Sequence, residues 1–238
     1  MQTTPNERIF CIGNPMLDIS VTCSDDSLLK KYDLTLGAAI LAEPKHMPIF
    51  DEVFNMKGME ARIGGAALNT ACSTAYALKQ MGVSDSKTDY MGCIGKDERG
   101  TKVETYCKEV GVTTNFCKSE DKPTACCAVL VYNQDRTLTT DLAAAQAYEE
   151  SHFDANMDVL KKAKFIYTTG YFITSSPASL AKAAAYANEN DVPFGFNLSA
   201  VFLQFIEKDN LMKGIEAADF VFCNEDEAAQ FIQTAGMP

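Results

Sequence analysis

Polar side chains follow the first apolar run of this sequence, Arg8–Gly13, and a glycine pair further along the chain. Asn14 and Asp18 come directly after that run, and Asn69 follows the pair Gly64–Gly65. A carboxylate can accept two hydrogen bonds from a vicinal diol such as the hydroxyls of a ribose, and an amide can both donate and accept. Each residue also has a structural alternative, because Asp after Asn-Pro often stabilises a turn and paired glycines often begin a helix.

A second polar group, Asn224–Glu227, follows the apolar run 220–223. Asn is a good helix N-cap, and carboxylates in a first helical turn interact favourably with the helix dipole. The functional alternative is that Asn224 and Glu227 help to hold a hydrated Mg²⁺ and its phosphates, since Mg²⁺ prefers oxygen ligands and keeps several waters. The residues alone leave both interpretations open.

The sequence offers few residues for other kinds of catalytic or binding site. It contains neither the Gly-x-x-x-x-Gly-Lys-Ser/Thr phosphate loop nor the dinucleotide fingerprint Gly-x-Gly-x-x-Gly. Its two histidines, His46 and His152, lie among polar neighbours, so we expect both on the solvated surface rather than in a triad or metal site. Nine cysteines with no Cys-x-x-Cys spacing indicate reduced thiols.

Alternating strands and helices must position these residues. Apolar runs predict strands at 8–13, 90–95, 165–169, 193–197 and 220–223. Helical spacing occurs at 47–59, 66–81, 98–110, 177–190, 207–217 and 225–234. This order predicts a parallel sheet with helices on both faces, which binds ligands at the carboxyl ends of its strands. Tyr171, Phe172 and Asn197 also follow such strands.

Two further groups of strands are half polar. They span 18–23 and 38–42, and then 125–132 and 137–142, the last two joined by a turn at 133–136. Alternation of polar and apolar residues is typical of strands with one solvated face. We expect the later hairpin to pair with the earlier strands in a small separate sheet.

The composition excludes several classes of protein. With 238 residues, 47% of them hydrophobic and 22% charged, the chain is long and apolar enough for a globular core. The formal charge of −11 disfavours nucleic acid and anionic membranes as partners. No apolar stretch is long enough to span a bilayer, and the polar start at 1–7 predicts a cytoplasmic protein, with a nuclear location as the alternative.

Six motifs carry a family resemblance. They are Gly13–Ser20, Gly64-Gly65 with Asn69, Gly92–Asp97, Leu142–Ala145, Asn197–Ala200 and Asn224-Glu225-x-Glu227. In this order they resemble the ribokinase-like (PfkB) family of carbohydrate and nucleoside kinases over essentially the whole chain. Gly-Gly-x-x-x-Asn and Asn-x-x-Glu are family-wide, whereas Asn-Pro-x-Leu-Asp-Ile-Ser, Leu-Ala-Ala-Ala and Asn-Leu-Ser-Ala are similar to the branch that phosphorylates adenosine.

The resemblance implies an α/β, three-layer α/β/α fold with a mostly parallel central sheet and a small β-sheet lid. Residues 1–238 would form one incomplete domain, with lid strands from about 18–42 and 123–142. The implied activity is transfer of the γ-phosphoryl group of ATP, with Mg²⁺, to the 5′-hydroxyl of adenosine. The products would be AMP and ADP, as in purine salvage, and the protein would act as a monomer without nucleic-acid or membrane partners.

The resemblance also implies roles for individual residues. Ribose would be held by Asn14, Asp18, Gly64, Gly65 and Asn69, with Asn197 also on the substrate side. Adenine would be enclosed by Met16, Leu41, Cys127, Leu138, Thr140, Leu142, Phe172 and Phe202. On the ATP side the resemblance implies Asn224 and Glu227, with Glu227 reaching Mg²⁺ through water. Arg136 would contact phosphate when the lid closes, or would remain a solvated turn residue.

Two departures from the family pattern stand out. Ala66 and Leu68 replace residues that are often polar, which puts one ribose contact in doubt. The family's base, the Asp of a Gly-Ala-Gly-Asp motif, does not occur in the 238 residues, so we expect it beyond Pro238. We therefore expect adenosine recognition without phosphoryl transfer, together with an exposed apolar sheet edge. The alternatives are another sugar or nucleoside kinase of the family and a non-catalytic nucleoside-binding module.

Overall fold

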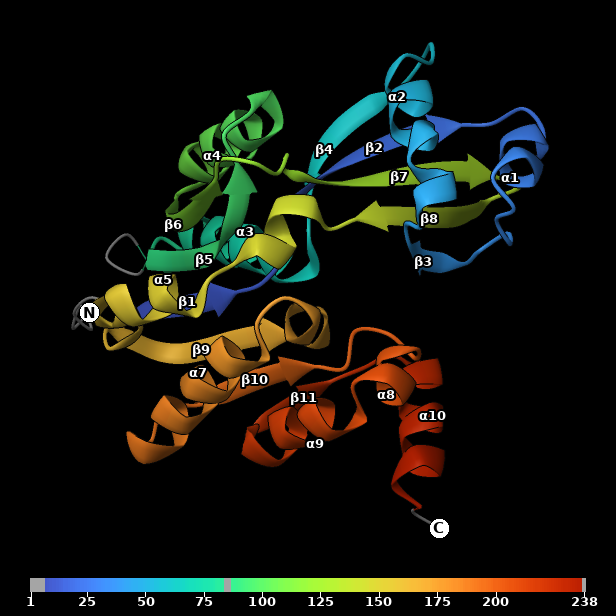
Figure 1. Ribbon diagram of the computed structural model, residues 1–238. Helices are drawn as coiled ribbons and strands as arrows, with labels where there is room; N and C mark the ends of the chain where they lie inside the picture. The colour runs from blue at the N-terminus through green and yellow to red at the C-terminus, as the bar shows by residue number, and fades with distance from the viewer. Residues whose placement is uncertain (1–6, 84–86, 237–238) are drawn as a thin grey trace.

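Six strands form a fully parallel main sheet in the computed structural model, which describes residues 7–83 and 87–236 (Figure 1). Their order across the sheet is β11-β10-β9-β1-β5-β6. The bounds are β1 Arg8–Ile12, β5 Lys87–Gly95, β6 Val112–Ser119, β9 Ala163–Thr169, β10 Phe194–Asn197 and β11 Phe220–Phe222. The central strand β1 is apolar on both faces because helices cover both, as expected for a parallel sheet.

Helices cover the main sheet in two layers. Phe10 and Ile12 of β1 face one layer, and Cys11, which lies between them, faces the other. The first layer contains α5 Glu150–Ala155, α6 Met157–Leu160, α7 Pro177–Glu189 and α9 Lys208–Ala217. The second contains α3 Ala66–Gln80 and α4 Glu98–Val110. The predicted three-layer α/β/α fold is therefore confirmed.

A five-stranded mixed sheet, which we call the lid, stands beside the main sheet. Its order is β3-β8-β7-β2-β4. Its elements are β2 Met16–Thr22, α1 Ser27–Lys31, β3 Ala39–Leu41, the 3₁₀ turn η1 Pro44–His46, α2 Pro48–Phe54, β4 Glu60–Gly64, β7 Ala125–Tyr132 and β8 Asp135–Asp141. The hairpin β7–β8 pairs with β2 and β3, as predicted.

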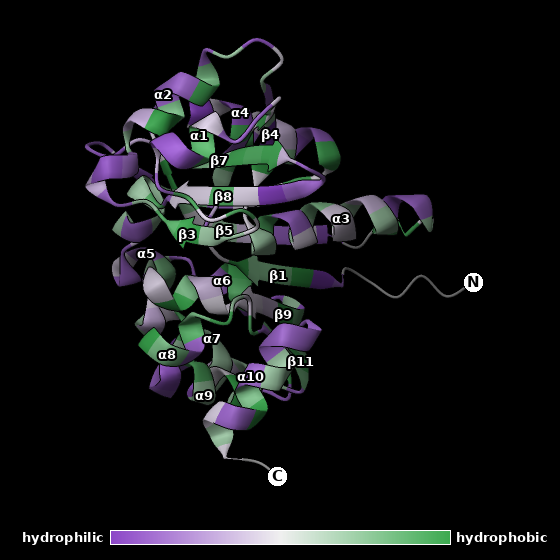
Figure 2. Ribbon diagram, turned by 90° about the vertical axis from the view of Figure 1, so that its right-hand side faces the viewer, coloured by the Kyte–Doolittle hydropathy of each residue, from purple (hydrophilic) through white to green (hydrophobic). Residues whose placement is uncertain are grey.

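The two faces of the lid differ. Leu17, Ile19 and Val21 of β2 pack under α1 and α2, so this outer face is covered (Figure 2). Met16, Asp18 and the residues in register with them point to the opposite side, because successive strand residues alternate between faces. The open face of the lid is thus available for a ligand.

The chain crosses between the main sheet and the lid four times, after β1, β4, β6 and β8. At the third crossing Asp97, the N-cap of α4, accepts hydrogen bonds from the backbone N–H groups of Gly100 (2.7 Å) and Thr124 (2.8 Å). It also accepts one from the Thr124 hydroxyl (2.6 Å). The Gly92–Asp97 motif therefore fastens the start of the lid strand β7 to the main body.

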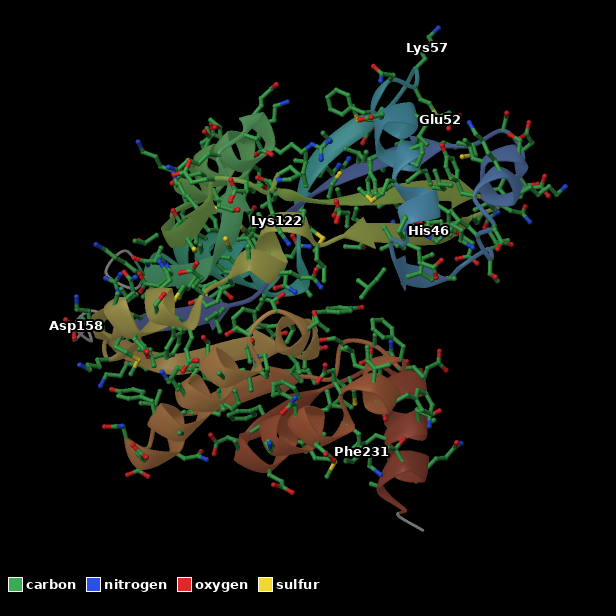
Figure 3. The ribbon with its side chains drawn as sticks, in the orientation of Figure 1. His46, Glu52, Lys57, Lys122, Asp158 and Phe231 are labelled. Atoms are coloured by element: carbon green, nitrogen blue, oxygen red, sulfur yellow. The ribbon has the colours of Figure 1, made fainter. Side chains whose placement is uncertain are left out.

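Several local predictions differ from the structure. His46 is 1% exposed rather than solvated, and its Nδ1 accepts a hydrogen bond from the backbone N–H of Glu43 (2.9 Å; Figure 3). His152 is half-buried, with its Nε2 3.0 Å from the carbonyl oxygen of Asn115. The predicted helix 47–59 ends at Phe54 and gives way to β4.

The part of the chain that the structure describes is completed by four further elements. They are η2 Ala143–Ala147, η3 Gly170–Thr174, α8 Leu203–Ile206 and α10 Glu225–Ala235. All nine cysteines are free thiols, as predicted. Over residues 7–83 and 87–236, none of the helices has the length and apolar character that crossing a bilayer requires.

Candidate functional site

A cavity of about 250 Å³ lies between the open face of the lid and the carboxyl ends of the main-sheet strands. Most of its wall is apolar, with a few polar side chains, which is the usual character of a small-molecule site. It is lined by Asn14, Met16, Asp18, Ala39, Ile40, Leu41, Gly65, Ala66, Asn69, Cys127, Leu138, Thr140, Leu142, Thr169, Tyr171, Thr174 and Phe202. Eleven of the fourteen predicted substrate residues therefore line one cavity.

Asp18 presents its carboxylate at one end of this cavity. Burial raises the pKa of Asp18 to about 6. Gly64, on the neighbouring strand β4, leaves the space that the carboxylate occupies: a Cβ on Gly64 would lie 2.1 Å from Asp18 Oδ1. Gly64 thus makes room for the Asp18 carboxylate from behind and is not part of the cavity wall. A half-buried carboxylate facing a cavity is a strong acceptor for ligand hydroxyls.

Gly65 brings two chain segments together beside Asp18. Its backbone has φ +100°, and a Cβ there would lie 2.2 Å from the carbonyl oxygen of Asn14. Asn14 itself is 4% exposed and donates from Nδ2 to the carbonyl oxygen of Tyr171 (3.0 Å). Its buried Oδ1 has no partner among the described residues. A buried acceptor without a partner calls for a donor from a ligand.

Asn69 completes the polar end of the cavity from the first turn of α3. Its backbone N–H donates to the carbonyl oxygen of Gly65 (2.8 Å), so the glycine conformation fixes where the helix begins. Its exposed side chain lines the cavity. Asn14, Asp18 and Asn69 therefore gather amide and carboxylate groups at one end of an otherwise apolar space.

Aromatic and aliphatic side chains form the other end of the cavity. The rings of Tyr171 and Phe202 lie with their centroids 6.4 Å apart at an interplanar angle of 44°. Leu138 and Cys127 face them from the lid. Cys127 accepts a hydrogen bond from the Thr140 hydroxyl at 3.3 Å, and burial raises the pKa of its thiol to about 12. This end suits a flat apolar ring system.

Two predicted substrate residues lie elsewhere. Phe172 is fully buried and packs edge-to-face on Tyr148, with ring centroids 5.4 Å apart, while its neighbour Tyr171 faces the cavity. Successive side chains of a 3₁₀ turn point in different directions, so only one of the two can line the cavity. Asn197 accepts a hydrogen bond from the backbone N–H of Ser199 (2.7 Å) and shapes the turn after β10.

Arg136 lies on the open lid face beyond the cavity. It is exposed and lines an adjoining groove together with Arg62, and Asp18 and Asn69 border both spaces. Four residues along β8 separate it from Thr140, which corresponds to about 14 Å. Arg136 is thus placed at the rim of the site, as a charge that a movement of the lid could bring closer.

Asn224 and Glu227 form a reciprocal capping box at the start of α10. Asn224 Oδ1 accepts from the Glu227 backbone N–H (2.8 Å), and Glu227 Oε2 accepts from the Asn224 backbone N–H (3.2 Å). Glu227 does not line the cavity, but its charge, after burial, raises the pKa of the cavity residue Tyr171. The capping interpretation is confirmed, and the other carboxylate oxygen of Glu227, Oε1, has no hydrogen-bond partner among residues 7–83 and 87–236.

Sequence reasoning missed part of the cavity wall. Thr169, Thr174, Ala39 and Ile40 line the cavity but are not among the predicted site residues, although Thr169 ends a predicted strand and Ala39 and Ile40 belong to another. The rule that ligands collect at strand ends finds Tyr171 and points to Thr169 next to it, whereas Thr174 shows no signal in the sequence.

Comparisons with known proteins identify the family of this chain. Residues 26–237 match the family model described as pfkB family carbohydrate kinase. The chain belongs to the pfkB family. Among curated proteins it is similar to an adenosine kinase of Dictyostelium discoideum, with 40% identity over 94% of this chain. This chain spans about 65% of the length of that relative.

Solved structures of adenosine kinases share the fold. One is an adenosine kinase from Schistosoma mansoni in complex with adenosine, with a TM-score of 0.89, 33% identity and coverage of 96% of this chain and 65% of that one. Another is an Anopheles gambiae adenosine kinase in complex with P1,P4-di(adenosine-5) tetraphosphate, also with a TM-score of 0.89 and 33% identity. That match covers 98% of this chain and 71% of the other.

Proposed function

We propose that this chain carries the nucleoside-binding part of an ATP-dependent adenosine kinase, which transfers the γ-phosphoryl group of ATP to the 5′-hydroxyl of adenosine. The observation that carries the proposal is the division of a single cavity into a polar end and an apolar aromatic end. A nucleoside has the same division, because its sugar offers donors and acceptors and its base offers a flat ring. The similarity to adenosine kinases supports adenosine as the nucleoside.

Ribose would bind at the polar end. The Asp18 carboxylate would accept hydrogen bonds from two adjacent hydroxyls, and Asn69 would donate to and accept from the same diol. The unpartnered Oδ1 of Asn14 would accept from a further sugar hydroxyl. Gly65 would allow the sugar to approach the backbone closely, which a Cβ would prevent.

Adenine would occupy the apolar end. Tyr171 and Phe202 would contact the ring from the main-sheet side, and Leu138 would contact it from the lid. A ligand in this position touches both parts of the molecule. Binding would therefore favour closure of the lid, which excludes water from the 5′-hydroxyl.

Phosphate-side roles fall to Arg136, Asn224 and Glu227. Glu227 uses Oε2 in the capping box, which leaves Oε1 for a water-mediated contact to Mg²⁺, whereas Asn224 serves as the cap that positions Glu227. Mg²⁺ would neutralise phosphate charge, and the triphosphate would supply its remaining ligands. Arg136 would add positive charge at the rim of the site. We propose no catalytic base among residues 7–83 and 87–236.

Isothermal titration tests the nucleoside-binding proposal. We expect adenosine to bind with a dissociation constant in the micromolar range, about −8 kcal/mol, and to bind at least about tenfold more tightly than ribose. Inosine, which keeps the ribose but changes the base, reports how far the apolar end selects adenine. Equal affinity for ribose and adenosine would favour a sugar kinase instead. A folded sample, checked by circular dichroism, that binds neither ligand would refute the proposal.

Adenosine affinity is expected to decrease as the pH falls through about 6. The pKa of Asp18 is raised by burial to about 6, so the carboxylate that accepts the ribose hydrogen bonds is mostly protonated below that pH. If only the ionised form binds tightly, affinity at pH 5 is about tenfold lower than at pH 8. Titration at pH 6 in buffers of different ionisation enthalpy should show proton release on binding. A flat affinity from pH 5 to 8 would contradict this role of Asp18.

A further inference from the structure

Two thiols lie close together beneath the groove between α3 and α4. Cys72 of α3 and Cys107 of α4 belong to the same apolar cluster on one face of the main sheet. Cys72 is 9% exposed and lines an open groove of about 840 Å³, whereas Cys107 is completely buried behind it. A small solute can therefore reach Cys72 first and only then Cys107.

Accessibility divides this pair into two roles. Cys72 lines the groove, whereas Cys107 is fully buried behind it, so a solute in the groove meets Cys72 first. A hydrogen bond with the Cys107 thiol lowers the pKa of Cys72, which favours the same order. The thiolate is the nucleophilic form of cysteine. Cys72 is thus the group that reacts first, and Cys107 is the buried partner held against it.

The groove also connects this pair to the nucleoside cavity. Asn69 lies one helical turn before Cys72 on α3 and lines both the groove and the cavity. Residues three apart on a helix share a face, so a shift of Cys72 toward α4 displaces Asn69 as well. A structural change at the thiols can therefore move a side chain at the polar end of the cavity.

We propose that Cys72 and Cys107 form an oxidisable thiol pair, which a hydroperoxide converts into a disulfide that links α3 to α4 and weakens ligand binding through Asn69. In the first step the Cys72 thiolate attacks one peroxide oxygen, the O–O bond breaks, and a sulfenic acid and hydroxide (or alkoxide) form. In the second step the Cys107 sulfur attacks the Cys72 sulfur, the S–OH bond breaks, and the departing hydroxide takes the Cys107 proton to form water.

The disulfide must change the packing of the two helices. Its S–S bond of about 2.05 Å is roughly 1.5 Å shorter than the separation of two thiols in contact, so α3 and α4 must approach each other locally. Because the interior is closely packed, such a shift is transmitted rather than absorbed. The effect on adenosine affinity rests on the function proposed above, whereas formation of the disulfide does not.

A second close pair provides a matched control. Cys93 and Cys117 lie opposite each other in the β5–β6 ladder. Burial, followed by the neighbouring Cys117, raises the pKa of the Cys93 thiol to about 12, and Cys93 is only 1% exposed. Cys117 is half-buried, but neither thiol of this pair lines the groove, so we expect the pair to stay reduced. The exposed Cys223 would react non-specifically and is removed by Cys223→Ser.

The experiment is a peptide map of Cys223→Ser protein after exposure to hydrogen peroxide and blocking of free thiols with N-ethylmaleimide. Trypsin separates the cysteines of interest, since Cys72 falls in 63–79, Cys107 in 103–108, Cys93 in 88–96 and Cys117 in 109–118. We expect one disulfide, between 63–79 and 103–108. The absence of this disulfide, or earlier formation of the Cys93–Cys117 bond, would overturn the proposal.

Two single variants test the order of the steps. In Cys107→Ser, the sulfenic acid on Cys72 has no resolving thiol and should be trapped by dimedone, whereas Cys72→Ser should yield no adduct on Cys107. The reverse pattern would overturn the assigned roles. The Cys223→Ser map decides the question of the disulfide even if either variant fails to fold.

Titration of the oxidised and reduced Cys223→Ser protein with adenosine tests the consequence for binding. We expect about a tenfold loss of affinity on oxidation, reversed by dithiothreitol. Unchanged affinity in a fully disulfide-bonded sample would overturn the link through Asn69. If reduced protein does not bind adenosine, the proposed function fails, and the peptide map still decides whether the thiol pair is oxidisable.

Discussion

Asp18→Asn is expected to lower the affinity for adenosine by about 100-fold. The amide has the same shape as the carboxylate, but it replaces an ionised acceptor of two hydrogen bonds with a neutral group that offers one acceptor oxygen. Hydrogen bonds to charged groups contribute about 1.5–3 kcal/mol each, so the loss of about 3 kcal/mol in total corresponds to this factor. Isothermal titration at pH 8, where Asp18 is ionised, measures the change directly.

The same variant should be more stable than the parent protein at high pH. Burial raises the pKa of Asp18, so the ionised carboxylate destabilises the folded state. This penalty is absent below the unfolded pKa of about 4, grows as the pH rises, and is complete above about 6. We therefore expect Asp18→Asn to raise the Tm at pH 8 and to leave it nearly unchanged at pH 4.

Asp33→Asn provides the control for this pair of measurements. Asp33 also belongs to the lid, and its side chain is 87% exposed and paired with Lys45. Exposed ion pairs contribute little to stability, so neither the Tm nor the adenosine affinity should change appreciably. An Asp18→Asn variant that binds adenosine like the parent would show that the carboxylate is not the ribose acceptor.

Gly65→Ala is expected to abolish measurable adenosine binding and to destabilise the fold by about 2–3 kcal/mol. The residue has φ +100°, which disfavours any side chain, and the new Cβ would lie 2.2 Å from the carbonyl oxygen of Asn14. Relieving this clash must separate Asn14 from the start of α3, and with it from Asn69. Urea denaturation and titration of the still-folded sample give the two quantities.

Gly58→Ala separates backbone strain from the steric clash. Gly58 also lies in the lid and has φ +85°, but nothing lies within 4 Å of its would-be Cβ. The variant should therefore lose about 1–2 kcal/mol of stability through strain alone and should keep its adenosine affinity. If Gly65→Ala behaves no worse than Gly58→Ala, the close approach of Gly65 to Asn14 is not what shapes the site.

Most of the main sheet was predictable because apolar residues recur with different spacings in its strands and in its helices. The helix at α4 was predicted over its full extent, since a capping Asp precedes it and a glycine follows it. Two of the four edge strands, β6 and β4, were not predicted, whereas β3 and β11 were. The sequence of β6 reads Val-Thr-Thr-Asn-Phe-Cys-Lys-Ser, and β4 exposes three of its five residues. A strand with one paired edge needs fewer apolar residues, so its sequence resembles a loop.

The types of residue at the polar end of the site were predictable from the sequence itself. The residues of the apolar end were predictable only through family resemblance. Asn14 and Asp18 follow a buried strand, and this position alone made them candidates. Leu138 and Leu41 look like any strand residue until the lid is folded over the main sheet. The difference between Tyr171 and Phe172 depends on the direction of one 3₁₀ turn, which no local sequence rule determines.

The four crossings between main sheet and lid also bear on the order in which the protein folds. In the lid, β2 pairs with β7, and their partners Met16 and Ala125 are more than 100 residues apart along the chain. Closing so long a loop from the unfolded chain carries a large entropic cost. Yet β2 directly follows β1, and β7 directly follows β6, so pairing of β1, β5 and β6 already brings the two lid strands near each other. We expect the main sheet to form first and the ability to bind a ligand to be the last property that a refolding chain acquires.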